Sequence, residues 1–468
     1  MRMEMRGEVI IGLCLCMLLF FCPVPQAADY PYGDYYNKQL TTTSTGNTRG
    51  PSINGKGDKI AFSSDQDLLG NGSAYPQLFL WSSTSGLTPI TSDVCYMWGW
   101  TNGYTPLPSI NFAGDRIAYR SFTNFWFCET NIMLWKSEVG SATKIVSTGC
   151  TWAGIDPLKI SGNGKKVLFR SNEDFKVVGN NYNALYLWDE DTSAITKIDT
   201  TESDATLPDI YLSVNYDGTL AAYSTICTTG SYAGKNPDAN WETYLWNKSD
   251  NSISQITSTS GGGSNGGCRE PSITSYTIST TTGTTSMTKI AFSSDRDLLT
   301  SNPDNNPEIF LWTIYGSYTS TNTGSYTQIT STSVSGGACR NPQISRDGKF
   351  VTFTSNVDIV SGGLSLLTGG TSAIFVWNAN GVITQVNSSG DNPVIASYTG
   401  LKENDTIQYG PRIAYYSTVD GSDDIYLATS TIPVPATSRW GLIILILVLV
   451  SLAVFMLKRR RQTTKGEV

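Results

Sequence analysis

The chain of 468 residues contains no histidine. This absence excludes a Ser-His-Asp or Cys-His catalytic arrangement, zinc bound through imidazole, and acid–base catalysis by histidine. One stretch, GGSNG at 262–266, does fit the G-x-S-x-G pattern of serine hydrolases. It lies in a glycine-rich segment with no strand-to-helix context and no base to activate Ser264, so we interpret it as a loop.

Charged residues are scarce, at 15% of the chain, and their formal balance is −7. The basic run KRRR at 458–461 lies close to the C-terminus, so the rest of the chain is more acidic still. An acidic body argues against nucleic acid or an anionic lipid surface as its partner.

Long amphipathic patterns are also missing, because the middle of the chain has no extended apolar stripe of period 3.6. Its apolar runs are short, rich in β-branched and aromatic residues, and bounded by Gly, Asn, Asp or Pro. Together with the abundance of Gly, Ser, Thr and Asn, these runs predict an all-β protein with many polar turns.

Two long apolar runs occur, one near each end. The run at 9–21 follows Arg2 and Arg6, and it predicts a signal peptide over residues 1–28. The uncharged run at 441–457 predicts one transmembrane helix, which a linker at 431–440 precedes and a basic cytoplasmic tail at 458–468 follows. We therefore expect an exported protein of the cell envelope or cell surface with a single-pass membrane anchor.

Between these ends one pattern recurs seven times. Each copy has a Pro-x-Ile-like opening, a turn rich in Gly and Asp, a strand like IAFSS, a strand like FLW and usually a closing strand like QIT. The opening prolines are Pro51, Pro108, Pro157, Pro208, Pro271, Pro342 and Pro393. Six of the third strands contain a tryptophan at the same position: Trp81, Trp135, Trp188, Trp246, Trp312 and Trp377. Four short strands per unit are typical of a β-propeller blade, so the sequence predicts a seven-bladed propeller over 37–430.

The seventh copy lacks its closing strand, and a matching fragment, QLTTTSTG at 39–46, precedes the first copy. A closed ring needs every blade to be complete, and one sheet shared by the first and last segments leaves no exposed edge. We therefore expect residues 38–44 to pair with the strand at 424–428 and to close the ring.

The repeat resembles the WD-like propeller repeats of the TolB type across about residues 37–430. The C-terminal segment, IPVPATSRWG followed by the apolar run and the arginine cluster, resembles the IPTL-type sorting signals of Gram-negative surface proteins. It departs from them in having VPATSR where those signals prefer a Leu-Ser-Glu run. The resemblance implies a surface or periplasmic protein and carries over no catalytic residues.

Six cysteines follow the signal peptide, and an even number in an oxidising compartment suggests three disulfides. Cys268 and Cys339 occupy the same repeat position in consecutive blades, so we expect a bridge between them. The pairing of the other four stays open: Cys95, Cys128, Cys150 and Cys227.

Two candidate binding surfaces lie on the face that carries the long loops. Arg49, Arg269, Arg340 and Asp391 stand two residues before an opening Pro, in blades that ring closure makes neighbours. They predict either a pocket for a carboxylate or phosphate or an Arg–Asp network that ties the blades together. The loops also carry Trp98, Trp100, Trp126 and Trp241, which are either binding residues or packing residues of the rim.

Two acidic loops offer weak ligands for calcium, which is the one cofactor that the sequence leaves open. The carboxylates are Asp65, Asp67, Asp295 and Asp297. Asp and Asn also cap turns by bonding their own backbone, and the EF-hand pattern is absent.

We expect a non-enzymatic binding or scaffold protein at the bacterial cell envelope, whose partner is a protein or a glycan. The alternative is a hydrolase or lyase that acts on polysaccharide with carboxylates and a metal. A third possibility is a purely structural envelope protein.

Overall fold

The computed structural model describes the chain between residues 30 and 430 with gaps. The described residues are 30–32, 35–43, 46–70, 72, 76–91, 107–122, 130–147, 155–171, 184–199, 210–261, 266–280, 283–316, 324–360, 365–367, 371–396, 411–419 and 422–430. The predicted signal peptide and the segments at 431–440, 441–457 and 458–468 lie outside them. Within the described part, no helix is both long and apolar enough to cross a membrane.

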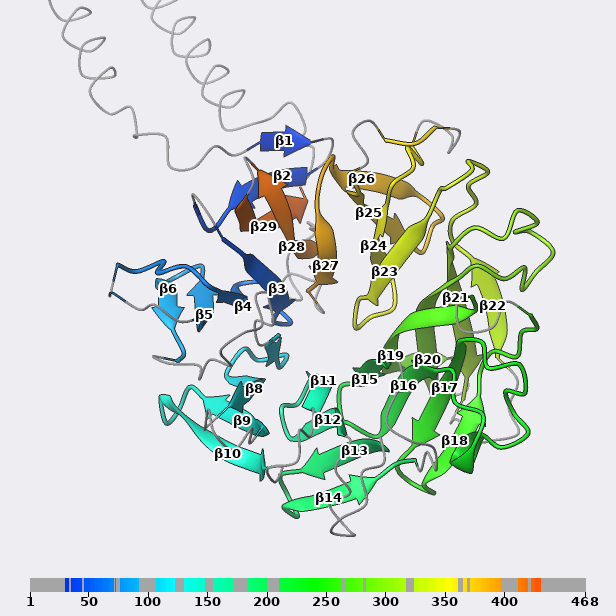
Figure 1. The fold of residues 1–468 in the computed structure, drawn as a ribbon, viewed down its shortest axis with the longest axis horizontal. Helices are drawn as coiled ribbons and strands as arrows, with labels where there is room; N and C mark the ends of the chain where they lie inside the picture. The colour runs from blue at the N-terminus through cyan, green and yellow to red at the C-terminus, as the bar shows by residue number, and fades with distance from the viewer. Residues whose placement is uncertain are drawn as a thin grey trace, which may run out of the picture.

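The strands form seven antiparallel sheets around a central axis, which confirms the predicted seven-bladed propeller (Figure 1). Blade 1 is β3 (Thr48–Ile53), β4 (Lys59–Ser64), β5 (Gln77–Ser82) and β6 (Gly86–Pro89). Blade 2 is β7 (Ser109–Ile110), β8 (Arg116–Phe122), β9 (Thr130–Lys136) and β10 (Ser141–Ser147). Blade 3 is β11 (Ile155–Ile160), β12 (Lys166–Ser171), β13 (Ala184–Asp189) and β14 (Ala194–Lys197). Blade 4 is β15 (Tyr211–Val214), β16 (Leu220–Thr225), β17 (Glu242–Asn247) and β18 (Ser252–Gln255), and its loop carries the short helix η1 (Gly230–Tyr232).

The last three blades complete the ring. Blade 5 is β19 (Cys268–Thr280), β20 (Gly283–Ser294), β21 (Glu308–Tyr315) and β22 (Ser325–Gln328). Blade 6 is β23 (Cys339–Ile344), β24 (Phe350–Ser355), β25 (Ala373–Asn378) and β26 (Ile383–Asn387). Blade 7 is β27 (Asp391–Ile395), β28 (Arg412–Val419) and β29 (Ser422–Ser430), and it is completed by β2 (Tyr35–Gln39) and β1 (Tyr30–Tyr32).

The first strand of each blade lines the centre of the ring (Figure 1). We call the face where these first strands begin the mouth face; it also carries the loops between second and third strands. The opposite face, which carries the turns between first and second strands and between third and fourth strands, is the turn face.

The middle strands of each blade are apolar on both sides because they are buried between neighbouring blades. Core clusters therefore join adjacent blades, as Leu134 of β9 and Phe169 of β12 do. Within six of the blades an aromatic ring of the second strand stacks on one of the third, with centroids as close as 5.5 Å for Tyr415 and Tyr426. These cross-strand pairs explain the aromatic positions of the IAFSS-like and FLW-like strands.

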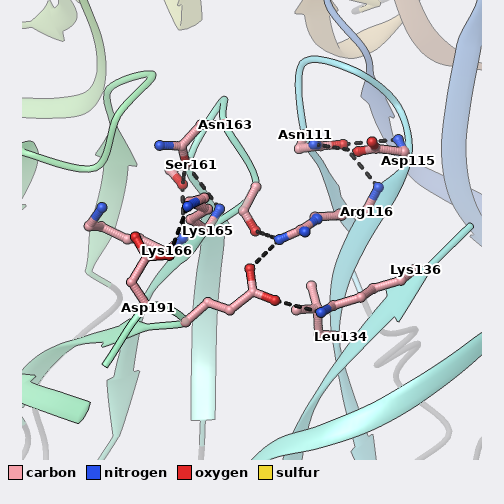
Figure 2. Close-up of polar contacts among 12 residues, drawn as sticks. Asn111, Asp115, Arg116, Leu134, Lys136, Ser161, Asn163, Lys165, Lys166 and Asp191 are labelled. Atoms are coloured by element: carbon pink, nitrogen blue, oxygen red, sulfur yellow. Dashed lines mark hydrogen bonds and ion pairs between the residues drawn. The ribbon is translucent and has the colours of Figure 1, made fainter. Parts of the chain in front are cut away.

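Repeated polar contacts fasten each blade to the next. The basic residue that begins a second strand donates to a backbone carbonyl in the following blade's first turn, as Lys59 Nζ does to Gly114 O at 2.9 Å. Arg116, Lys166, Lys289 and Arg412 repeat this contact. Between blades 2 and 3 Arg116 also shares the carboxylate of Glu190 with Lys136. Figure 2 shows the side chains of Arg116 and Lys136 both extending towards blade 3.

A second repeated contact explains the Thr-x-Thr part of the closing motif. The third strands of blades 4 and 5 begin with buried Glu242 and Glu308. The Glu308 carboxylate accepts hydrogen bonds from the hydroxyl groups of Thr330 and Thr332 and from the Thr332 backbone N–H, and Thr257 and Thr259 hold Glu242 in the same way. We call this arrangement the Thr-acid clasp.

Blade 7 carries the same clasp, but its two halves come from opposite ends of the chain. Asp424 Oδ1 accepts from Thr41 Oγ1 at 2.8 Å and from Thr43 Oγ1 at 3.1 Å. The Thr43 backbone N–H donates to the same oxygen at 3.0 Å. The fragment QLTTTS therefore serves the last blade as QITSTS serves blades 4 and 5.

Ring closure by the N-terminal segment is thus confirmed, but the predicted strand bounds were displaced. The ladder pairs Tyr35 with Ser430 and Gln39 with Tyr426, so the strand begins at Tyr35 instead of at residue 38. The strand ends at Gln39 because the residues beyond Leu40 turn to hold Asp424. β1 adds a fifth strand that the sequence did not predict.

Replacing Thr41 and Thr43 with Val removes two hydroxyl donors from Asp424 without changing side-chain volume. Hydrogen bonds to charged groups each contribute about 1.5–3 kcal/mol, so we expect the double variant to lose at least about 2 kcal/mol of unfolding free energy in urea. Thr42 between them is exposed, so Thr42→Val is the matched control and should unfold as the wild type does. Equal stability of all three proteins would contradict the clasp.

Burial raises the pKa of Glu308 despite the hydrogen bonds from Thr330 and Thr332. Between the ordinary glutamate pKa and the raised pKa, the folded chain holds more protons than the unfolded chain, so this residue's contribution to stability falls as the pH rises. We expect the difference in unfolding free energy between wild type and Glu308→Gln to shrink from pH 4 towards neutrality in urea titrations. Exposed Glu138→Gln should follow the wild-type profile. A Glu308→Gln profile parallel to wild type would refute this role.

Candidate functional site: the channel mouth

The first strands of four neighbouring blades are kinked at the mouth face. Each ladder of blades 5, 6, 7 and 1 shifts its register just before the opening Pro, because the strand carries a β-bulge there. The residue preceding the Pro has a left-handed backbone, with φ of 64° at Gly50, 58° at Glu270, 56° at Asn341 and 45° at Asn392. Such a conformation is costly for residues other than glycine, and it is maintained where the surrounding contacts fix it.

The contacts that fix these bulges run from blade to blade. Glu270 Oε2 of blade 5 accepts from the Asn341 backbone N–H of blade 6 at 2.7 Å and from Ser293 Oγ at 2.9 Å. The Asn341 amide then donates to Asp391 Oδ1 of blade 7 at 3.1 Å, and Tyr416 OH donates to Asp391 Oδ2 at 3.1 Å. Burial, and then the Asp391 carboxylate, raises the pKa of Tyr416 to about 12, so this phenol stays a donor at neutral pH.

Arg49 continues the chain of contacts from blade 7 into blade 1. Its guanidinium pairs with Asp423 and lies 5.6 Å from the centroid of the Tyr416 ring. Burial alone would lower the pKa of Arg49, but the hydrogen bond to Asp423 raises it above its ordinary value. An Arg–Asp pair therefore joins blades 7 and 1, but its acid is Asp423, which adjoins the clasped Asp424, and not the predicted Asp391.

The two remaining arginines of the predicted set occupy the corresponding positions in blades 5 and 6. The Arg269 guanidinium lies 5.2 Å from the centroid of the Trp241 ring. Arg340 is half-buried, and among the described residues its guanidinium has no ion-pair or hydrogen-bond partner. The mouth therefore presents alternating charges: Arg269, Glu270, Arg340, Asp391, Arg49 and Asp423.

Of the four tryptophans in the predicted aromatic surface, only Trp241 falls among the described residues; Trp98, Trp100 and Trp126 lie outside them. Trp241 is 4% exposed and contacts Tyr211 edge-on at 5.5 Å. Its backbone bonds to Gly266 and Cys268 fix it between blades 4 and 5. Of the two alternatives for Trp241, its burial favours packing at the rim, because neighbouring blades cover its ring.

The axis is occupied at the opposite end, on the turn face. The Arg346 guanidinium lies 3.5 Å from the centroid of the Tyr216 ring and 4.7 Å from that of Phe112. These residues come from the first turns of blades 6, 4 and 2, which are not neighbours in the ring, so they meet across the axis. A Cβ atom on Gly162 would lie 2.3 Å from Tyr216 Cδ2, so the close approach of the turns requires glycine there.

The predicted disulfide between Cys268 and Cys339 is wrong, because both cysteines are free and fully buried. Each thiol donates to a serine on the second strand of its own blade: Cys268 Sγ to Ser294 Oγ at 3.2 Å and Cys339 Sγ to Ser355 Oγ at 3.5 Å. They belong to different core clusters instead of facing each other at the rim. Cys227 is also free and buried, whereas Cys95, Cys128 and Cys150 lie outside the described residues.

The four weak calcium ligands bond to turns or to neighbouring side chains. Asp65 accepts from Asn47 N at 2.7 Å, Asp67 from Gly72 N at 2.7 Å and Asp297 from Ser301 N at 2.6 Å. Asp295 accepts from Gly267 N at 2.8 Å. Across the described segments, no group of three or more His, Cys, Asp and Glu side chains is placed to hold a metal ion.

Sequence reasoning missed several residues of the mouth. Glu270 and Asn341 directly follow predicted residues, and their position before an opening Pro was an available signal. Asp423 and Arg346 stand in turn-like stretches that resemble ordinary polar turns, so no sequence signal distinguished them.

Solved structures similar to this chain share its propeller fold at low sequence identity. The oligogalacturonate lyase from Vibrio parahaemolyticus is 12% identical, with a TM-score of 0.52 over 86% of this chain and 96% of that chain. The β-propeller domain of the Trilobed protease from Pyrococcus furiosus is 11% identical, with a TM-score of 0.45 over 85% of this chain and 100% of that chain. An oligogalacturonate lyase in complex with manganese is 15% identical, with a TM-score of 0.46 over 87% of this chain and 97% of that chain. No protein-family model and no curated protein matches the sequence, so the similarity shows the fold alone: the chain is a seven-bladed β-propeller.

Thiol reactivity tests the correction at Cys268 and Cys339. Burial, and then the charge of Glu242, raises the pKa of Cys268 to about 12, and burial likewise raises the pKa of Cys339. We expect neither thiol to react with a disulfide reagent at pH 8 while the protein is folded, because the thiolate is the nucleophile.

After denaturation without reductant, the wild type should show two more thiols than the Cys268→Ser, Cys339→Ser double variant. Equal thiol counts in the two denatured proteins would show that Cys268 and Cys339 form the predicted disulfide.

Proposed function

We propose that the protein is an exported, membrane-anchored and non-enzymatic binding or scaffold protein of the bacterial cell envelope. Its partner, a protein or a glycan, binds at the channel mouth through an anionic group. The predicted signal peptide at 1–28 and the predicted transmembrane helix at 441–457 support a location of the propeller outside the cytoplasm.

Arg340 is the observation that supports this function. A half-buried guanidinium has five N–H donors and a positive charge, and none of the described residues of the chain satisfies those of Arg340. The neighbouring blades give Arg49 an ion pair and Arg269 an aromatic ring, so Arg340 differs from both. A carboxylate or phosphate would satisfy it through two parallel hydrogen bonds.

The surrounding contacts favour a preorganised site over an adaptable one. The bulges on both sides of Arg340 are held by Glu270, Asn341 and Asp391, and these bonds do not involve the arginine. Binding at a site that is already ordered avoids the entropic cost of arranging its groups. Arg346, Tyr216 and Phe112 meet across the axis on the turn face, so a ligand of Arg340 would approach from the mouth face.

A second function, hydrolysis or lyase cleavage of an acidic polysaccharide, is favoured by one arrangement at the same mouth. Glu270 and Asp391 both accept from Asn341, and Tyr416 donates to Asp391. Two carboxylates and a phenol are groups that serve general acid–base catalysis. The similar structure of an oligogalacturonate lyase makes oligogalacturonate a suitable probe for both functions.

Calorimetric titration with oligogalacturonate and with its neutral methyl ester tests the site. We expect binding of the charged form alone, about tenfold or more weaker in Arg340→Ala because a charged hydrogen bond is lost. Arg340→Lys should recover part of the affinity, since Lys keeps the charge but not the paired donors. Lys56→Ala on the turn face is the matched control.

Two outcomes would count against this proposal. Affinity that Arg340→Ala leaves unchanged would remove the arginine from the site. Release of new reducing ends by the wild type, lost in Asp391→Asn, would establish the second function in place of the first.

A further inference from the structure

We propose that the turn face of the propeller rests on the membrane, with neutral phospholipid headgroups as its partner, so that the channel mouth points away from the bilayer. This inference rests on the membrane anchoring in the proposed function. It adds an orientation and a second interaction surface to that function.

The first argument is where the chain leaves the ring. Ser430, the last residue of β29, pairs with Tyr35, the first residue of β2. The preceding residue, Thr429, pairs with Arg412 at the start of β28, whose guanidinium donates to Gly57 O in the first turn of blade 1 at 3.2 Å. The C-terminal end of the propeller therefore emerges on the turn face.

The second argument is the reach of the linker. Ten residues, 431–440, separate Ser430 from the apolar run, and they include Pro433 and Pro435. An extended proline-rich linker spans about 31 Å at ~3.1 Å per residue. The nine residues of β29 already span about 30 Å. If the mouth face lay on the bilayer, the linker would have to run back along the full length of the blade and would be used up. If the turn face lies on the bilayer, the apolar run can enter it directly after the end of β29.

The third argument is the chemistry of the turn face. Val139 and Tyr315 are 66% exposed, Val382 is 53% exposed and Tyr36 is 50% exposed. Val139 and Val382 stand in turns whose backbones bond to the first turns of their own blades, through Ser137 and Ala379. The mouth face also exposes apolar residues: Leu69, Leu107, Leu299, Val360 and Leu366. Both tyrosines among these exposed residues lie on the turn face, and tyrosine is enriched at the boundary between water and lipid.

Blade 5 extends this face with a long hairpin. Its β19 and β20 have 13 and 12 residues, whereas the first strands of the other blades have six or fewer. In the strand register of this extension, Met287 lies opposite Tyr276 on one side and opposite Tyr315 on the other. Ile278 lies opposite Thr285.

No charged residue occurs from Ser275 to Thr288. Exposed strand edges in water are normally protected by charges, so an uncharged hairpin is better suited to a lipid headgroup layer.

The charges on this face select the kind of lipid. The first turns carry exposed Lys56 and Lys349 as well as exposed Asp217 and half-buried Asp347. A face with both signs matches zwitterionic headgroups, which carry both signs themselves, better than it matches an anionic surface. The net negative charge of the whole chain also disfavours an anionic lipid surface.

Photo-crosslinking of the full chain in vesicles of phosphatidylethanolamine and phosphatidylcholine tests the orientation. A benzophenone amino acid replaces Ile278 on the hairpin or, as the matched control, Val360, which is 57% exposed on the mouth face. Mass spectrometry then measures lipid adducts. We expect several-fold more adduct at position 278 than at position 360, and a chain that floats with the vesicles.

Each contrary result has its own meaning. A chain that does not float overturns the anchoring and this inference with it. A chain that floats but reacts equally at both positions, or more strongly at 360, overturns the orientation and leaves the anchoring intact. Oligogalacturonate binding at Arg340, measured on the same variants, is independent of both results.

Discussion

The Thr-acid clasp of blade 7 is the contact on which the rest of the ring depends. Thr41 and Thr43 hold Asp424 from the other end of the chain, and the same arrangement recurs within the continuous chains of blades 4 and 5. The ring therefore closes with a bond type that its blades already use. Asp423 adjoins the clasped residue and pairs with Arg49, so closure also positions one part of the channel mouth.

The two faces of the ring differ because each repeat makes different contacts at its two ends. On the turn face, Lys and Arg side chains donate to backbone carbonyls of the following blade, and Arg346 contacts two aromatic rings at the axis. On the mouth face, bulges replace regular pairing, and Glu270, Asn341 and Asp391 link blades 5, 6 and 7. Strained backbone and polar side chains thus occur together on the mouth face. Strained backbone is common at ligand sites, so this is consistent with the proposed site there.

The fold could be predicted because its information is repeated seven times. The Pro-x-Ile openings and the six tryptophans gave the number of blades, and the displaced QLTTTS fragment revealed how the ring closes. The end of this strand at Gln39 could not be predicted, because Thr41 and Thr43 resemble strand residues in sequence although they turn to bind Asp424.

The site was less predictable because it depends on which side chains the bulges direct towards each other. Sequence spacing placed Arg49, Arg269, Arg340 and Asp391 at one mouth, but it could not reveal that Arg49 pairs with Asp423. Equivalent repeat positions suggested a bridge between Cys268 and Cys339, whereas each thiol instead bonds to a serine in its own blade. Equivalent positions in a propeller are close in space, but the direction of a side chain depends on the local backbone.

Native-state hydrogen exchange tests the closed ring most directly. The amides of Lys38, Leu40 and Ile425 belong to the pairing or to the hydrogen bonds that join the two ends of the chain. If the ring is closed as described, these amides exchange as slowly as those of the matching pair in blade 5, at Ile309 and Ile329. Exchange of the blade 7 amides at the rate of an exposed loop, while blade 5 stays protected, would contradict the closure.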